Sequence, residues 1–237
     1  MSVPHSKTCN GGWAVAYRRV EVPSEPLRGD ELTGAMVGIG MNFAAAAAAE
    51  PNIEDTLLAA SVEGMERDDL RVLAVLVTWL GIHHPWINAD RLIRSVRTQT
   101  SSRVRCFWAA VARWLHRDRR LVRLAELYDG PRIDLLRTGT SFQIRRRGED
   151  ERFVGGSLRA PAGVLRDRPS DVLAAAELVR RHRTYRYRVL MGPSYRADMW
   201  AALELDPTLS PSELARQTYG SFATAWQVKH DWDLLAA

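Results

Sequence analysis

The sequence has almost no lysine and almost no cysteine. Only Lys7 and Lys229 are lysines among its 33 basic residues, so arginine carries nearly all of the positive charge. The two cysteines, Cys9 and Cys106, lie far apart and belong to no CxxC pair, which argues against a zinc site. We therefore expect two free thiols in a reducing cytoplasm, and no metal or other cofactor.

Long apolar runs and a secretory signal are also missing. The longest apolar stretch, Leu70 to Leu80, is too short to cross a bilayer and is flanked by charged residues. It is typical of a buried core helix. We expect a cytoplasmic protein without a membrane partner.

The motifs of common enzymes are not found either. There is no nucleophile elbow, P-loop or HExxH motif, and the glycines of Gly34 to Gly40 do not have the spacing of a phosphate loop. His83 and His84 are adjacent and precede a proline, which favours surface histidines over a metal site. These absences indicate a protein that is not an enzyme, although a nuclease built from residues distant in sequence stays open as an alternative.

Positive charge is concentrated in the middle of the chain. Arg91 to Arg188 contains 24 arginines against 10 acidic residues, whereas the remainder has 9 basic and 18 acidic residues. A cationic surface of this size attracts polyphosphate and favours DNA or RNA as a partner. An arginine-rich composition can also reflect a genome-wide bias, so the clustering is more informative than the choice of arginine.

The stretch from Asn88 to Arg123 combines these arginines with helix periodicity. Asn88 is a suitable N-cap for a short helix, Thr98 to Ser102 are small and polar, and a second helix begins near Ser102. The apolar positions of that helix repeat with helical spacing at Val104, Phe107, Trp108, Val111, Trp114 and Leu115. This layout predicts a helix-turn-helix whose second helix enters the major groove. An ordinary antiparallel helix pair with a solvated basic face is the alternative.

Short β-like segments follow. Leu121 to Leu127 and Ile133 to Leu136 are predicted strands, and Ser141 to Arg147 with Glu151 to Gly155 is a predicted hairpin. A helix-turn-helix followed by a hairpin is the winged-helix arrangement. The alternative is a solvated hairpin whose charges only maintain solubility. The arginines expected on the wing are Arg145, Arg146, Arg147 and Arg152.

After a linker at Pro161 to Pro169, the pattern predicts helices again. One long helix is expected from Asp171 to about Leu190, followed by a helix from Tyr195 to Leu205 that Ser194 caps. Ser210, Pro211 and Glu213 have the pattern of a capping box, and a last helix is expected from Phe222 to Leu235. The spacing of six between Trp226 and Trp232 matches that between Trp108 and Trp114, which suggests two copies of one unit.

The segment SPSELARQTYGSFATAWQVKHDW is similar to the helix-turn-helix portion of bacterial winged-helix regulators. That resemblance implies that Leu214, Ala225, Trp226 and Trp232 are structural. It also implies a base-facing or phosphate-facing role for Ser221, Thr224, Gln227 and Lys229. The expected arrangement of two domains with a basic surface also resembles that of the AbiEi class of antitoxins. The acidic residues Asp231 and Asp233 are unfavourable on a helix that reads DNA. The alternative is therefore that this copy forms a protein-binding or dimer surface.

Taken together, the sequence predicts a mainly α fold with small β-hairpins, arranged as tandem winged-helix units. The expected division is a poorly ordered segment 1–50, a winged-helix domain 51–160, a linker and connecting helix 161–192, and a helix-turn-helix unit 193–237. The expected function is a transcriptional regulator or antitoxin-type repressor that binds double-stranded DNA, with a homodimer as a candidate assembly. The alternative is a protein-binding subunit. The predicted DNA-binding residues are Ser102, Arg103, Arg105, Arg113, Arg117, Arg145, Arg146, Arg147, Arg152, Ser221, Thr224, Gln227 and Lys229.

Overall fold

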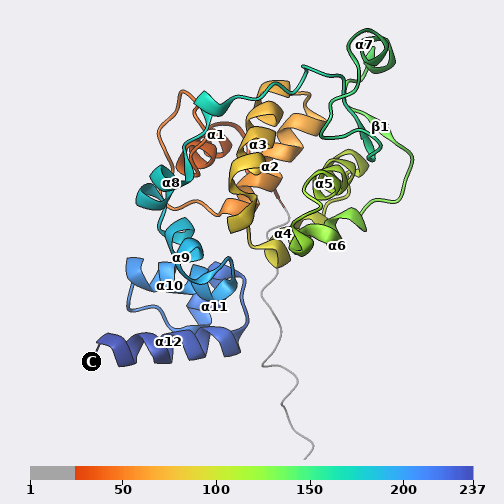
Figure 1. The fold of residues 1–237 in the computed structure, drawn as a ribbon. Helices are drawn as coiled ribbons and strands as arrows, with labels where there is room; N and C mark the ends of the chain where they lie inside the picture. Colours follow the sequence, from red (N-terminus) through yellow and green to blue (C-terminus); the bar gives the residue numbers. More distant parts are fainter. Residues whose placement is uncertain (1–24, 237) are drawn as a thin grey trace, which may run out of the picture.

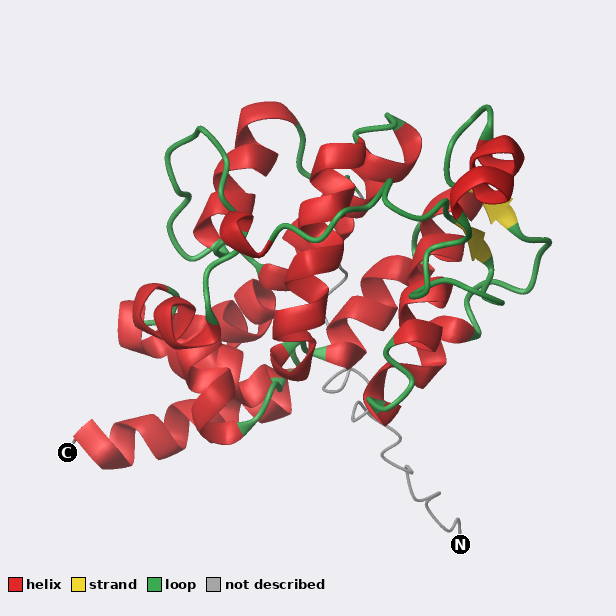
Figure 2. Cartoon of the chain, turned by 45° about the horizontal axis from the view of Figure 1, so that its top comes forward, coloured by secondary structure: helices red, strands yellow, loops and turns green. Residues whose placement is uncertain are grey.

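The computed structural model describes residues 25–236, and within them the protein is mainly helical with one small two-stranded sheet (Figures 1 and 2). The predicted thiol at Cys9 lies outside the described residues, as do residues 1–24 of the segment expected to be poorly ordered. The first helices are α1 (Gly29–Gly38), α2 (Ile53–Glu66), α3 (Leu70–His83), η1 (His84–Trp86), α4 (Ala89–Arg97), α5 (Ser102–Trp114), η2 (Arg119–Leu121) and α6 (Val122–Ala125). The later elements are β1 (Ile133–Asp134), α7 (Thr140–Arg147), β2 (Leu158–Arg159), η3 (Pro169–Asp171), α8 (Ala175–Arg181), α9 (Arg183–Met191), α10 (Tyr195–Leu205), α11 (Pro211–Thr218) and α12 (Phe222–Ala236).

Helices α2 and α3 form the centre of the large core (Figure 1). The stretch from Val72 to Leu80 of α3 is buried without a break, and the Asp69 side chain accepts the N–H groups of Arg71 and Val72 at the start of the helix. Gly64 of α2 permits close packing, because a Cβ there would come within 2.8 Å of the Leu73 side chain. No helix within residues 25–236 is long and apolar enough to span a membrane.

The segment before α2 packs against this core. Helix α1 buries Met36, and the Trp79 indole of α3 donates a hydrogen bond of 2.8 Å to the Ile39 carbonyl. Met41 is also fully buried. The prediction of poor order is therefore wrong for residues 29–41, because their scattered apolar side chains cover α2 and α3 even though they show no sustained period.

The predicted pair of helices after Asn88 is confirmed, but its second helix is not exposed. Asn88 caps α4 and Ser101 caps α5, each through a side-chain oxygen that accepts a backbone N–H group. Helix α5 is buried between α2, α6 and β2. Its small residues are enclosed together with its large ones: Val104, Cys106, Phe107, Trp108, Ala109, Ala110, Val111 and Ala112.

The predicted wing is wrong. Residues of its first strand form helix α7, which ends at Gly148 with a φ of 84°, and 151–156 consist of turns and bends. The predicted strand Leu121–Leu127 is also wrong, because η2 and α6 occupy it. A strand exists at Ile133–Asp134, but it pairs in parallel with β2. A parallel pair cannot be a tight hairpin, since its strands need a long crossover.

The expected long helix from Asp171 to Leu190 is divided. His182 adopts an extended conformation between α8 and α9, and its Nδ1 accepts the Tyr185 N–H group at 3.2 Å. The preceding segment does not behave as a loose linker, because Leu165 is buried in the large core. Tertiary packing therefore breaks a stretch that local propensity favours as one helix.

Helices α10, α11 and α12 form a C-terminal three-helix unit with a small core of its own (Figure 1). Ser194 caps α10, and the capping box of Ser210 and Glu213 at the start of α11 is confirmed. Tyr219 follows α11 with a φ of 56°, so it forms the left-handed turn into α12.

The two predicted copies have different environments. Trp108 of α5 is fully buried and donates to the Ser61 hydroxyl at 3.0 Å, whereas Trp226 of α12 is 54% exposed. The matching tryptophan spacing therefore does not produce equivalent helices.

Candidate nucleic-acid interface

Helix α12 keeps one long face open to solvent. Phe222, Trp226, His230 and Leu234 recur every four residues and are all exposed, so they form one stripe on this helix. The rings of Trp226 and His230 are stacked with their centroids 5.6 Å apart. Ala225 and Val228 are buried on the opposite face, where they pack into the C-terminal unit.

The predicted contact residues of α12 divide into two groups. Ser221 and Thr224 form the start of the helix, since the Ser221 hydroxyl accepts the Thr224 N–H group at 3.1 Å. Gln227 is exposed and its amide donates to Asp231 at 2.8 Å, while Lys229 pairs with Asp233. The polar groups of α12 therefore bond mainly within the helix, and Gln227 remains on its outer side.

Arg103 of α5 bonds to backbone groups of the protein itself. Its guanidinium donates to the carbonyls of Met65 at 2.8 Å, Asp134 at 3.2 Å and Leu135 at 2.9 Å. Arg105 is half-buried, and Ser102 is exposed beside it at the first turn. The structure therefore does not present Arg103 and Arg105 on an open recognition helix, which corrects the prediction that α5 reads DNA bases.

Replacing Arg103 with alanine is expected to lower the free energy of unfolding by about 2 kcal/mol, because three carbonyls lose their donor. Urea denaturation measures this loss. Arg113→Ala is the matched control on the same helix, since Arg113 is exposed and has no ion pair within residues 25–236; its effect should stay within about 0.5 kcal/mol. Equal stabilities of the two variants would contradict the structural role of Arg103.

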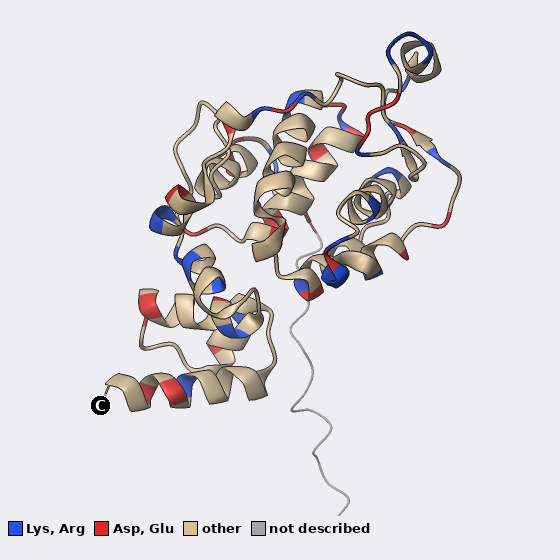
Figure 3. Ribbon diagram, in the orientation of Figure 1, with Lys and Arg blue, Asp and Glu red and all other residues tan. Residues whose placement is uncertain are grey.

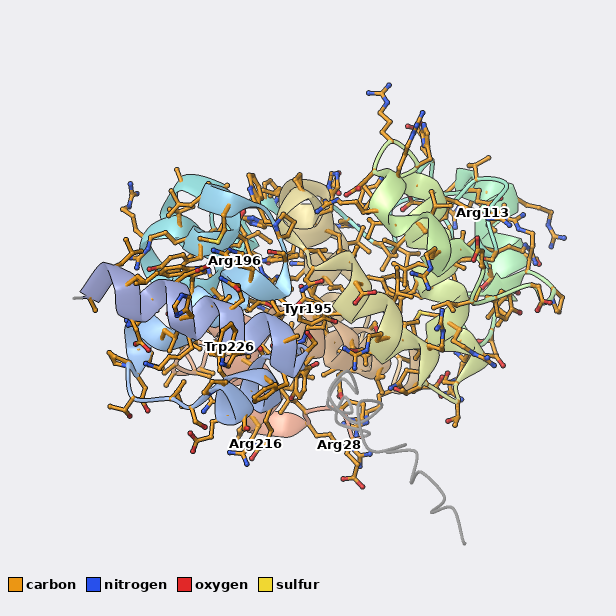
Figure 4. The ribbon with its side chains drawn as sticks, turned by 90° about the horizontal axis from the view of Figure 1, so that it is seen from below. Arg28, Arg113, Tyr195, Arg196, Arg216 and Trp226 are labelled. Atoms are coloured by element: carbon orange, nitrogen blue, oxygen red, sulfur yellow. The ribbon has the colours of Figure 1, made fainter. Side chains whose placement is uncertain are left out.

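A second group of arginines lies at the ends of α4 and α5 and on η2 and α6. Helix α4 contacts both η2 and α6, and α6 also contacts α5, so these elements pack together. We call this group the arginine surface; its exposed members without an ion pair inside the described part of the chain are Arg97, Arg113, Arg117, Arg119 and Arg123. Figure 3 colours several residues of these elements blue as Lys or Arg, and Figure 4 shows Trp226, Tyr195 and Arg113 in sequence along one face. Of the residues predicted to bind DNA on α5 and directly after it, Arg113 and Arg117 thus remain exposed.

The arginines expected on a wing are separated from α12. Arg145, Arg146 and Arg147 are exposed on α7, which lies at the opposite end of the molecule from α12 (Figure 1). Arg152 is held by Asp150 and Asp167 and is only partly exposed. The structure therefore does not bring these four residues to the same surface as α12.

A buried ion network joins the C-terminal unit to the large core. Arg188 of α9 is 1% exposed and makes five hydrogen bonds, one for each of its N–H groups. Its bonds reach both oxygens of Glu54 at 2.6 and 2.9 Å, both oxygens of Asp198 at 2.7 and 3.0 Å, and the Trp86 carbonyl at 3.2 Å. Burial alone would raise the pKa of Glu54, but Arg188 keeps that pKa below its ordinary value.

Arg91 of α4 extends the same network. It lies 3.3 Å from Asp55, and its guanidinium is 4.1 Å from the centre of the Tyr219 ring, in the turn before α12. Sequence reasoning missed this network, because a helix pattern places a charged residue by default on the solvent side. The network fixes α10, and the turn into α12, against α2 and α4.

An open cavity of about 360 Å³ lies where α4, α6 and α10 meet. Asn88 and Ser194, the caps of α4 and α10, both line it, together with Arg120 and Arg123. Asp90 and Tyr195 also line it, and the Tyr195 hydroxyl donates to the Asp90 carboxylate at 3.0 Å. The cavity therefore combines two helix N-termini with two guanidinium groups.

The histidine pair is not a surface pair. His83 is fully buried, with Nδ1 2.7 Å from the Tyr185 hydroxyl and Nε2 3.0 Å from the Leu173 carbonyl, so the prediction of a surface position is wrong for His83. His84 is partly exposed. Within residues 25–236 no group of three or more potential ligands could hold a metal ion.

The fold and the site together define a mainly helical protein in which a C-terminal three-helix unit stands beside an arginine surface. No family model matches the chain. Comparison with curated proteins gave no match. Comparison with solved structures gave none either.

Proposed function

We propose that this protein is a non-catalytic double-stranded DNA-binding protein, acting as a transcriptional regulator or antitoxin-type repressor, in which α12 is the recognition helix. The observation that supports the proposal is that the exposed helix α12 follows Tyr219, whose carbonyl accepts a hydrogen bond of 3.0 Å from Arg94 of α4. Helices α11 and α12 are joined by the short turn Tyr219 to Ser221, which is the spacing of a helix-turn-helix.

Helix α12 has side chains that suit base edges in a major groove. Gln227 is exposed, and glutamine pairs with adenine through two hydrogen bonds. Phe222 is 43% exposed at the first turn, where an apolar side chain suits the methyl group of thymine. These residues of α12, and not those of α5, form the proposed base-reading group.

The arginine surface would supply phosphate contacts. Its five exposed arginines can each replace a counterion of the duplex, which gives affinity without sequence preference. The acidic residues Asp231 and Asp233 do not oppose this role directly, because Arg196 and Lys229 pair with them. In this arrangement the duplex would extend from α12 across the start of α10 to α4 and α6.

Fluorescence anisotropy with a random 20-base-pair duplex at 50 and 200 mM salt tests the proposal. We expect the affinity to fall more than tenfold over this range, since several phosphate contacts are lost together. The double variant Arg97→Ala/Arg119→Ala should reduce the slope of log affinity against log salt by about two. Arg166→Ala/Arg180→Ala is the control, because both residues are exposed but lie outside the arginine surface. An equal change in both double variants would refute the proposed surface.

A protein partner is the second candidate. The observation that favours it is the exposed apolar stripe of α12, in which Trp226 is 54% and Leu234 is 64% exposed. An amphipathic helix of this kind fits an apolar groove on another protein, such as a toxin in the antitoxin hypothesis. Duplex binding that is absent or insensitive to salt would favour this candidate over DNA binding.

A further inference from the structure

Two adjoining cavities lie beside Trp114, the last residue of α5. One of about 310 Å³ lies between the end of α5 and the turns of residues 151–156, and the other, of about 290 Å³, lies between the end of α5 and His84. Trp114 and His116 line both cavities. The two cavities therefore form one groove around the indole ring, which we call the Trp114 groove.

The Trp114 ring is fixed against the large core but is not enclosed by it. It meets the ring of Phe153 edge to face, with the centroids 6.2 Å apart, and Phe153 belongs to the core. Trp79 and Trp108, which fill the same core, are at most 1% exposed, whereas Trp114 is partly exposed. A rigid aromatic ring that reaches solvent is a surface on which any nucleobase can stack.

Each half of the groove has one arginine without an ion pair. Arg113 lines the first cavity and Arg117 lines the second, and both are exposed and without an ion pair among residues 25–236. Arg152 also lines the first cavity, but two aspartates already hold it. Within the described part of the chain, Glu151 is the one acidic residue that lines the groove. The groove therefore has an excess of uncommitted positive charge, which favours an anionic ligand.

The size of the groove favours an unpaired nucleotide over a duplex. In a duplex the faces of each base are covered by its neighbours, so only a base that has left the stack can lie on an indole ring. Each cavity is near the lower limit of the volumes that hold small organic ligands, which suits a single base and not a whole helix. An arginine in each cavity then suits the phosphates on the two sides of that base.

We propose that the Trp114 groove binds one unpaired nucleotide of a single-stranded nucleic acid, with the base on the Trp114 indole and the flanking phosphates on Arg113 and Arg117. The inference rests on the proposed function insofar as both arginines belong to the arginine surface that is proposed to contact the duplex. It adds a preference that phosphate contacts alone lack. The protein would bind most tightly where a frayed end, a bulge or a melted segment lies next to the duplex on α12.

Two labelled single strands of eight nucleotides, one of thymidines and one of abasic sites, separate base stacking from charge. In fluorescence anisotropy at 50 mM salt, the original chain should bind the thymidine strand about tenfold more tightly, because stacking adds to phosphate binding. Trp114→Leu removes the ring and should make the two affinities equal. Its affinity for the abasic strand should not change, which also shows that the variant is folded. Trp114→Phe keeps an aromatic ring and should retain most of the preference.

A second tryptophan and a second arginine provide the controls. Trp226→Leu replaces an exposed tryptophan of α12 outside the groove and should keep the tenfold preference. Arg117→Ala should weaken the binding of both strands about fivefold, and the slope of log affinity against log salt should fall by about 0.7. Arg180→Ala, at an exposed position of α8, should bind both strands like the original chain.

The outcomes distinguish this inference from the proposed function. Equal affinities of the original chain for the two strands, or a preference unaltered in Trp114→Leu, would overturn the groove as a base site. Salt-dependent binding of the random duplex would leave the proposed function intact in that case. A thymidine preference that Trp114→Leu abolishes, without any duplex binding, would preserve the groove and overturn the proposed function. A preference lost in Trp226→Leu and kept in Trp114→Leu would assign stacking to α12 and overturn the groove.

Discussion

Replacing Arg188 with alanine is expected to lower the free energy of unfolding by about 3–5 kcal/mol. The reason is that Glu54 and Asp198, at 0% and 5% exposure, would lose the four hydrogen bonds that Arg188 donates to them and keep only one cation, Arg91, 3.9 Å from each. Two buried carboxylates that share one distant cation are far more costly than a broken surface pair. Urea denaturation followed by circular dichroism measures the difference.

Two further variants make this result specific to the network. Arg180→Ala removes an exposed arginine of α8 and should change stability by less than about 0.5 kcal/mol. Arg188→Lys keeps the positive charge but not the five fixed donors, so its loss should be intermediate. A loss below about 1 kcal/mol for Arg188→Ala would mean that Glu54 and Asp198 do not depend on this guanidinium.

The stability of the protein is expected to fall by about 2.5 kcal/mol between pH 7 and pH 4.5 through His83 alone. Burial lowers the pKa of His83 from 6.5 to about 4, and the hydrogen bond to the Leu173 carbonyl opposes this shift only in part. Between pH 6.5 and pH 4 the unfolded chain therefore binds more protons at this residue than the folded chain. The contribution is complete above pH 6.5 and is lost as the pH falls toward 4.

Thermal or urea unfolding at several pH values tests this dependence. His83→Gln should remove about 2.5 kcal/mol from the difference between pH 7 and pH 4.5, whatever its stability at pH 7. Some pH dependence should remain, because burial also lowers the pKa of His182. The control is His116→Gln, since His116 is exposed and lies outside the core. An unchanged pH dependence in His83→Gln would show that this imidazole is not enclosed as described.

Local signals in the sequence were sufficient for many helix boundaries. Asn88 caps α4, Ser194 caps α10, and Ser210 with Glu213 forms the capping box of α11, as their patterns predict. A cap is a bond between a side chain and an N–H group two or three residues away, so the sequence alone contains both partners. The mainly helical class followed from the same local patterns.

The wing and the exposure of α5 could not be predicted in this way. The segment from Thr140 to Arg147 alternates apolar and polar residues around Phe142 and Ile144, but it forms a helix and is not part of the two-stranded sheet of the described residues. In α5 the small residues Cys106, Ala109 and Ala112 are compatible with either a surface or a core. Their burial results from α2, α6 and β2, which are distant in sequence.

The chain by itself determined where most helices begin, where the basic charge is concentrated, and that α11 and α12 are joined by a short turn. Only the tertiary structure decided which arginines reach solvent and which bind inside. Arg103 and Arg188 are indistinguishable from surface arginines by periodicity, yet Arg103 donates to backbone carbonyls and Arg188 forms ion pairs with two buried carboxylates. The physical reason is that the environment of a charge depends on partners brought close by folding, whereas a helix cap depends on the next three residues.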